Sequence, residues 1–175
     1  MDDQTNIRWP DAIYAHFKRL GIRQVGYVPD AGHSRLIKLC CEAPEIADVV
    51  LTTEEEGIGL VTGAHFGGQR AALLMQSSGV GNCINMFSLV RNFGCPCLVL
   101  VTMRGEFAEF NQWQVPMGSI TEPVLKLAGF LTYRVEEAGE VDDVVGAAAD
   151  MAFDGDLSVA VLLSQRLIGR KRWTK

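Results

Sequence analysis

Five consecutive apolar residues, Ala71 to Met75, run directly into the polar, glycine-containing segment Gln76 to Asn82. A strand with one face in solvent alternates apolar and polar side chains, whereas a strand covered by helices on both faces is apolar throughout. The run therefore predicts a central strand of a parallel sheet. Because parallel neighbours are joined by crossover connections, usually helices, the same feature predicts a layered α/β fold.

The rest of the chain alternates short apolar runs with longer segments of helical period. Strands are expected at residues 24–28, 48–51, 71–75, 97–101, 131–135 and 158–163. Helices are expected at residues 10–20, 36–40, 53–66, 84–90, 122–127 and 141–153, and a long loop at 103–119. The expected architecture is α/β: a single doubly wound domain over residues 1–175, core about 10–165, with a mostly parallel sheet of about six strands flanked by helices.

The composition supports a folded globular domain and argues against two classes of partner. Of the 175 residues, 48% are hydrophobic and 21% charged, and the net charge of -5 disfavours a surface that tracks nucleic-acid phosphates. No apolar run approaches the roughly 18 residues of a membrane-spanning helix, and the acidic start Met1-Asp2-Asp3 differs from a signal peptide. We expect a cytoplasmic protein without nucleic-acid or membrane partners, and a solvated basic tail at Arg170 to Arg172.

The cysteines and histidines do not form a recognisable metal site. No C-x-x-C pair occurs among the five cysteines, and Cys40 and Cys41 are adjacent. We expect all five to be buried, reduced thiols, since free cysteine behaves as a small apolar side chain. The three histidines lie far apart in the sequence, so we expect no metal held by this chain alone.

Three consecutive carboxylates, Glu54 to Glu56, follow the expected second strand. Thr53 with Glu56 matches a capping box, and acidic residues suit the first turn of a helix, so Glu56 has a structural explanation. Glu54 stands where the chain leaves the carboxyl end of a strand, the edge at which open α/β sheets bind ligands. Glu54 is therefore a candidate catalytic residue, with a purely structural role as the alternative.

The segment Gln76 to Asn82 is expected to form a tight turn between a strand and a helix. Its backbone N–H groups could face a ligand, and Gly79 and Gly81 would permit close approach. A dinucleotide-binding fingerprint is a competing interpretation, but Ile84 occupies its third glycine position. A non-catalytic nucleotide- or phosphate-binding module and a turn without a ligand both stay open on these residues.

Two segments, with their order and separation, resemble a known family. Residues 54–64 read EEEGIGLVTGA and residues 68–82 read GQRAALLMQSSGVGN, while YVPD at 27–30, RG at 104–105 and QVPMG at 114–118 also fit. Over about residues 10–165 the chain resembles the pyrimidine-binding domain of thiamine-diphosphate enzymes. Within them it is most similar to sulfopyruvate decarboxylase alpha subunits and to the matching domain of phosphonopyruvate decarboxylases.

The resemblance implies a role for Glu54. In that family a glutamate lies nine positions before a glycine, as Glu54 does before Gly63, and it hydrogen-bonds the ring nitrogen of the cofactor's aminopyrimidine. Proton sharing there helps to remove the thiazolium proton and make the carbanion nucleophile. Together with Glu54, the implied cofactor-binding residues are Gln76, Ser77, Ser78, Gly79 and Asn82.

Three further residues are candidates for contact with a small anionic substrate. Arg104 follows a strand, and its guanidinium matches the geometry of a sulfonate, phosphonate or carboxylate; a surface ion pair is the alternative. His33 could act as an acid or base, with a solvent-exposed loop histidine as the alternative. Gln114 completes the expected substrate-contacting residues.

The resemblance also implies a partner. The family binds the cofactor's diphosphate through Mg²⁺ in a second domain that carries a G-D-G segment, and the nearest string here, Asp154-Gly155-Asp156, has another order. The implied protein is the alpha subunit of a two-subunit, oligomeric thiamine-diphosphate-dependent 2-oxoacid decarboxylase, active only with a beta subunit that holds the diphosphate and Mg²⁺. Conversion of sulfopyruvate to sulfoacetaldehyde and CO₂ is the expected reaction, with phosphonopyruvate as an alternative substrate.

Overall fold

A computed structural model describes residues 8–169, so the expectations for Met1 to Asp3 and for Arg170 to Arg172 lie outside the described residues. Six parallel strands form one sheet in the order β2-β1-β3-β4-β6-β5. They are β1 (Ile22–Tyr27), β2 (Ala47–Val50), β3 (Arg70–Gln76), β4 (Cys97–Thr102), β5 (Leu131–Val135) and β6 (Ser158–Leu163). The predicted α/β class and the six-stranded, doubly wound parallel sheet are confirmed.

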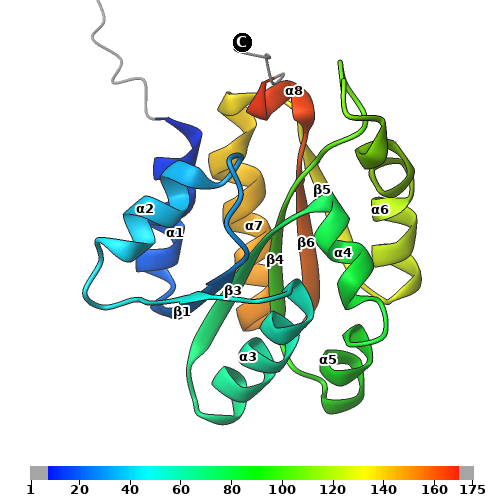
Figure 1. The fold of residues 1–175 in the computed structure, drawn as a ribbon. Coiled ribbons are helices and arrows are strands. Elements are labelled where there is room, and N and C mark those ends of the chain that lie inside the picture. Colours follow the sequence, from blue (N-terminus) through cyan, green and yellow to red (C-terminus); the bar gives the residue numbers. More distant parts are fainter. Residues whose placement is uncertain (1–7, 170–175) are drawn as a thin grey trace, which may run out of the picture.

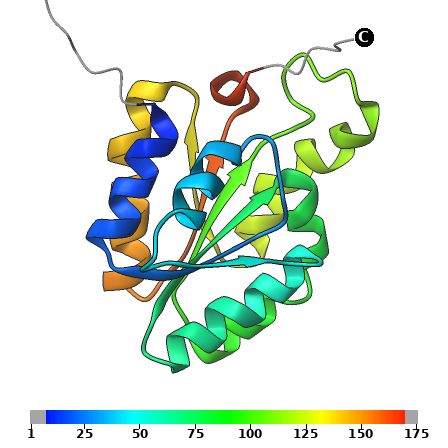
Figure 2. The same ribbon diagram turned by 60° about the vertical axis from the view of Figure 1, so that its left-hand side comes forward.

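Helices cover both faces of this sheet (Figure 1). One face carries α1 (Trp9–Arg19), α2 (Ser34–Cys41) and α7 (Val141–Asp154). The other face carries α3 (Glu54–Phe66), α4 (Ser77–Cys83), α5 (Phe87–Phe93) and α6 (Val115–Leu127). Two 3₁₀ turns, η1 (Gln112–Gln114) and η2 (Ala138–Glu140), and the short α8 (Gln165–Ile168) complete the described elements. The view in Figure 2 shows α1 packed along α7.

The two central strands explain their unbroken apolar sequence. Every residue of β4 is buried, and so are Ala71 to Met75 of β3. Successive residues enter opposite cores: Leu73 packs with α3, α4 and α5, whereas Leu74 packs with α1, α2 and α7. Burying a large apolar side chain of this kind stabilises the fold by about 1.5–3 kcal/mol. Polar alternation would place polar groups in one of these cores.

The strand order places a switch point between β1 and β3. The chain passes from β1 outward to β2, and from β3 in the opposite direction to β4. Ligands of open parallel sheets bind at the carboxyl edge of such a point. The segments that leave β1, β2 and β3 at this edge begin near Asp30, Glu54 and Gln76, respectively.

The predicted tight turn at Gln76 to Asn82 is wrong, because α4 begins at Ser77 directly after β3. The following helix, expected at 84–90, is α5 at Phe87–Phe93. Glycine has a low helix propensity, and for this reason the sequence indicated a turn at these residues. Here their missing side chains permit packing: a β-carbon on Gly81 would lie 3.1 Å from the Met117 sulfur.

The predicted loop at 103–119 is wrong in its second half. The turn η1 occupies Gln112–Gln114 and α6 begins at Val115, several residues before the expected helix. Pro116 lies in the first turn of α6, where its missing N–H removes no intrahelical bond. Only the segment from Met103 to Asn111 is irregular.

The expectation that all five cysteines are buried is wrong for one of them. Four of the five cysteines are buried, but Cys41 is exposed, and its thiol donates a hydrogen bond to Asp48 Oδ2 at 3.1 Å. No helix among residues 8–169 has the length and apolar character needed to cross a membrane.

Candidate active site

Three strand ends converge on one pocket at the switch point. Its walls are formed by Val28, Pro29, Asp30, Glu54, Gln76 and Ser78, and its volume is about 170 Å³. Two carboxylates, one amide and one hydroxyl thus line a single hollow. The structure therefore brings together three of the predicted site residues, Glu54, Gln76 and Ser78.

Glu54 is the first residue of α3, and two residues of α4 lie against its side chain. The Asn82 amide Nδ2 donates a hydrogen bond to Glu54 Oε2 at 2.8 Å. Gly79 lies against the same carboxyl group, since a β-carbon there would be 2.5 Å from Glu54 Cδ. Oε1 accepts no hydrogen bond from any residue between 8 and 169. Glu54 therefore presents one oxygen that can exchange a proton with a ligand.

Glu55 and Glu56 are exposed at the same helix start. The predicted capping box is wrong: Thr53 is the N-cap residue, but its side chain makes no capping hydrogen bond. Glu56 reaches back to the backbone N–H of Thr52 at 2.8 Å rather than to that of Thr53. Glu56 thus makes a hydrogen bond at the start of α3, but not that of a capping box.

Asp30 is a site residue that the sequence analysis did not single out. Its Oδ2 accepts hydrogen bonds from Thr102 Oγ1 at 2.7 Å and from Gly32 N at 3.1 Å, and its Oδ1 accepts one from Gln76 Nε2 at 3.0 Å. Gln76 Oε1 in turn accepts a bond from Ser78 Oγ at 3.1 Å. The signal was present, because Asp30 follows a strand end within a Pro-Asp turn.

Ser77 and His33 are buried and do not line the pocket. Ser77 is fully buried, and its Oγ accepts a hydrogen bond from Arg104 N at 3.1 Å, which ties α4 to the end of β4. His33 is 1% exposed, so the alternative of a solvent-exposed loop histidine is wrong. Its Nε2 lies 3.1 Å from Leu100 O. Burial lowers the pKa of His33 despite the nearby Asp30 carboxylate, which favours a neutral imidazole.

Arg104 is buried and paired with Glu109, so the alternative of a surface ion pair is wrong. Its Nε and Nη2 donate to the two Glu109 oxygens at 2.6 and 2.7 Å. Glu109 also accepts bonds from Gln165 Nε2, Asn111 N and Gly105 N at 2.9, 2.9 and 3.3 Å. The Arg104 guanidinium is the main cause that lowers the pKa of Glu109 to about 2. Glu109 therefore occupies one side of the guanidinium, the group that the sequence assigned to a substrate anion.

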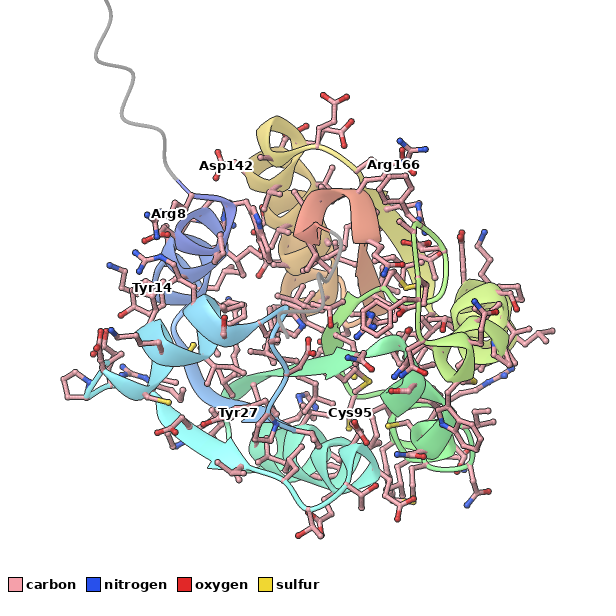
Figure 3. All side chains as sticks on the ribbon, turned by 45° about the horizontal axis from the view of Figure 1, so that its top comes forward. Arg8, Tyr14, Tyr27, Cys95, Asp142 and Arg166 are labelled. Carbon is pink, nitrogen blue, oxygen red and sulfur yellow. The ribbon has the colours of Figure 1, made fainter. Side chains whose placement is uncertain are left out.

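The loop that carries Glu109 is fastened to α8. Gln165 Oε1 accepts hydrogen bonds from Glu106 N and Phe107 N at 3.2 and 2.9 Å, and Gln165 N donates to Glu106 Oε1 at 2.8 Å. Arg166, labelled on α8 in Figure 3, lies over the Phe107 ring at 4.5 Å. These hydrogen bonds hold residues 106 and 107 against α8 at the carboxyl edge of the sheet.

Gln114 lies at the end of η1, and its Oε1 is buried without a hydrogen-bond partner among residues 8–169. The pocket walls do not include it. A larger hollow of about 420 Å³ lies between α1 and η2, lined mainly by small side chains. We place the chemistry at the smaller pocket, because Glu54, Asp30 and Gln76 converge there. No group of three or more His, Cys, Asp or Glu within residues 8–169 is arranged to hold a metal ion.

Comparison with known proteins finds relatives among sulfopyruvate and phosphonopyruvate decarboxylases. No family model matches the chain. Three sulfopyruvate decarboxylase alpha subunits are 33–34% identical over 86–87% of this chain. That of Methanococcus maripaludis is 33% identical over 154 residues, 87% of this chain and 92% of the relative. A sulfopyruvate decarboxylase of Methanosarcina acetivorans is 33% identical over 67% of this chain and 30% of its own length. A phosphonopyruvate decarboxylase of Streptomyces viridochromogenes is 33% identical over 66% of this chain and 30% of its own length.

A solved structure with a similar fold is the 2-oxoglutarate:ferredoxin oxidoreductase from Magnetococcus marinus. The superposition has a TM-score of 0.72 and covers 92% of this chain and 29% of that one. The sequence identity is 15%, so this likeness concerns the fold alone.

Proposed function

The chain belongs to the family of sulfopyruvate decarboxylase alpha subunits, and from this premise we propose that it is the alpha subunit of a thiamine-diphosphate-dependent 2-oxoacid decarboxylase. The proposed reaction converts sulfopyruvate to sulfoacetaldehyde and CO₂. The observation that carries the proposal is the Glu54 carboxylate, which lies on a pocket at the switch point with Oε2 held by Asn82 and Oε1 unbonded among the described residues.

The pocket fits one half of the proposed cofactor. A cavity of roughly 150 Å³ in another protein accommodates benzene, so a volume of about 170 Å³ is sufficient for a single six-membered ring. Glu54, Gln76 and Ser78 supply a carboxylate, an amide and a hydroxyl that match the hydrogen-bonding edge of an aminopyrimidine. We assign these residues to the pyrimidine half of the cofactor, together with Gly79, whose missing side chain leaves room beside Glu54.

Glu54 has the central chemical role in this proposal. When bound, thiamine diphosphate supplies the electron sink for loss of CO₂. With the cofactor bound, Glu54 would share a proton at Oε1 with the ring nitrogen, which is general acid-base chemistry. Asp30 keeps Gln76 in place through its Oδ1 and borders the same pocket. Ser77 contributes indirectly, by tying α4 to β4.

The relatives support a partner subunit. Three of them are named as alpha subunits, and in the Methanosarcina relative the matching region is 30% of a longer sulfopyruvate decarboxylase. We propose that residues 1–175 form a single pyrimidine-binding domain and that a beta subunit holds the diphosphate and Mg²⁺. A cytoplasmic location stays a prediction.

The substrate contacts stay proposals, and the structure changes the proposed mode for Arg104. Because Glu109 takes the N–H of Nε and one N–H of Nη2, a contact with the anionic head group would use the three remaining donors on Nη1 and Nη2. Arg104 borders a small cavity of about 20 Å³ together with Asp30 and Thr102. His33 and Gln114 stay predicted contacts without a place on the pocket wall.

Two alternatives are weaker. A phosphonopyruvate decarboxylase matches over less of the chain than the alpha subunits do. A non-catalytic phosphate-binding module relied on an open glycine turn, whereas Gly79 and Gly81 pack against Glu54 and Met117 within α4.

The test is CO₂ release with thiamine diphosphate and Mg²⁺, using the purified chain alone and the chain combined with its beta subunit. Sulfopyruvate, phosphonopyruvate and pyruvate serve as substrates. We expect no turnover by the chain alone and turnover by the complex, fastest with sulfopyruvate. Robust turnover by the single chain would contradict the two-subunit proposal. An inactive complex, in which inorganic phosphate protects the chain from unfolding, would favour the phosphate-binding alternative.

A further inference from the structure

We propose that Asn82 is a positioning residue that directs the exchangeable proton of Glu54 to Oε1, the oxygen that accepts no hydrogen bond from residues 8–169. The inference rests on the proposed role of Glu54. It assigns Asn82 an action through Glu54 and not a contact with the cofactor.

The first step of the argument is the direction of the hydrogen bond. Asn82 Nδ2 carries only donor hydrogens, so the bond of 2.8 Å requires a lone pair on Glu54 Oε2. A donor at Oε2 stabilises negative charge on that oxygen and opposes protonation there. The proton of a neutral Glu54 is therefore favoured on Oε1, and the same bond persists in both protonation states.

The second step is steric. Gly79 and Asn82 lie one helical turn apart on α4, so both face the start of α3. A β-carbon on Gly79 would lie 2.5 Å from Glu54 Oε1 and Cδ, so only glycine leaves the carboxyl group this position. Gly79 thus provides the space, and Asn82 fixes the orientation of the carboxyl group within it.

The third step concerns the charged neighbours. Cys83 on α4 is buried, and burial raises its thiol pKa to about 12, with Glu54 and Glu55 adding to the shift. Asp30 borders the same pocket with both oxygens bonded. No ion pair joins Glu54 to a cation within the range 8–169. The Asn82 amide is therefore the polar group that distinguishes the two oxygens of Glu54.

The experiment compares Asn82→Ala, Asn82→Asp and the control Asn85→Asp in the complex with the beta subunit. Asn85 is exposed just beyond α4 and makes no hydrogen bond with Glu54, so its substitution makes the same change of charge without removing a bond to that carboxyl group. Circular dichroism melting of each chain shows whether it is folded. The readouts are the dissociation constant of thiamine diphosphate, measured by calorimetry without substrate, and the pH dependence of kcat and kcat/KM.

For Asn82→Ala we expect kcat to fall by about 10-fold to 100-fold, within the range of effects on acid-base catalysis, while the cofactor dissociation constant changes much less. For Asn82→Asp we expect the acid limb of kcat/KM to move to higher pH by about one unit or more, because two adjacent carboxyl groups share a proton. Asn85→Asp should leave both the limb and kcat in place.

Two results would overturn the inference. One is an Asn82→Ala variant whose cofactor affinity falls as much as its kcat, which indicates a direct contact with the cofactor. The other is an Asn82→Asp profile that coincides with that of Asn85→Asp. If Glu54→Gln is fully active, the proposed function itself fails. If Glu54→Gln is inactive while the Asn82 variants behave like the unmodified complex, only this inference fails.

Discussion

Gly79 on α4 lies so close to Glu54 on α3 that a β-carbon at position 79 would stand 2.5 Å from the glutamate carboxyl carbon. Real β-carbons essentially never approach another atom so closely, so one of the two helices or the carboxyl group must shift when a side chain is added. The packing of α4 on α3 therefore sets the position of the proposed catalytic carboxylate.

Gly79→Ala should reduce both stability and turnover, because the added methyl group displaces Glu54 or separates α4 from α3. The control is Gly59→Ala in the middle of α3, where a β-carbon meets nothing within 4 Å. That substitution should stabilise the chain by about 0.5–1 kcal/mol, the usual gain from glycine to alanine in a helix. Urea unfolding and turnover of the complex measure both effects. A Gly79→Ala variant as stable as Gly59→Ala would contradict the packing.

Glu109→Gln should lower the free energy of unfolding by about 3–5 kcal/mol, because it leaves the buried Arg104 guanidinium without its counter-charge. The matched control is Glu42→Gln, which removes the exposed ion pair with Lys38 at 3.7 Å. Exposed pairs of this kind contribute at most about 1 kcal/mol. Urea unfolding of both variants at neutral pH makes the comparison, and similar losses would show that the Arg104–Glu109 pair has no special weight.

The same pair predicts a dependence on pH. The folded state lowers the pKa of Glu109 from its ordinary 4.5 to about 2, so its contribution is fully present above pH 4.5. That contribution falls as the pH decreases from 4.5 toward 2, because the carboxylate becomes protonated in the unfolded chain first. The stability difference between the unmodified chain and Glu109→Gln should therefore be constant from pH 7 to 5 and shrink below pH 4.5. A difference that grows on acidification would contradict this linkage.

Arg104→Lys should cost stability rather than substrate selectivity. Lysine keeps one charge but lacks the planar fork that Arg104 uses to hold both Glu109 oxygens. We expect a loss of about 1–3 kcal/mol in unfolding free energy, and a preference for sulfopyruvate over pyruvate that changes by less than about tenfold. Steady-state kinetics on both substrates check this. A larger loss of selectivity would restore the bidentate substrate contact that the sequence predicted.

The central strands were predictable because burial on both faces requires an unbroken run of apolar residues in the sequence. The apolar runs at β3 and β4 fall at the two central positions of the sheet, and Glu54 was identified at the start of α3. Local reasoning failed where packing between helices decides the conformation. Gly79 and Gly81 suggested a turn, but both lie in helix α4, where their missing side chains leave room for Glu54 and Met117.

The polar network around the site was less predictable, because it joins residues that are distant in the sequence. Asp30 meets Thr102 across 72 positions, and Gln165 meets Glu109 across 56. Nothing in the sequence around Arg104 indicated that Glu109 would take its guanidinium. His33 follows a turn, yet it points into the protein and reaches Leu100 O on β4.

The most direct test of the account compares Glu54→Gln with Glu56→Gln in the complex with the beta subunit. Glutamine at position 54 keeps the shape of the side chain but cannot hold and return a proton, so turnover of sulfopyruvate should fall by about a hundredfold or more. Glutamine at position 56 still accepts the hydrogen bond from Thr52 N, so its complex should stay within a few-fold of the unmodified one. Equal losses in the two variants would contradict the assignment of Glu54 as the carboxylate that serves the cofactor.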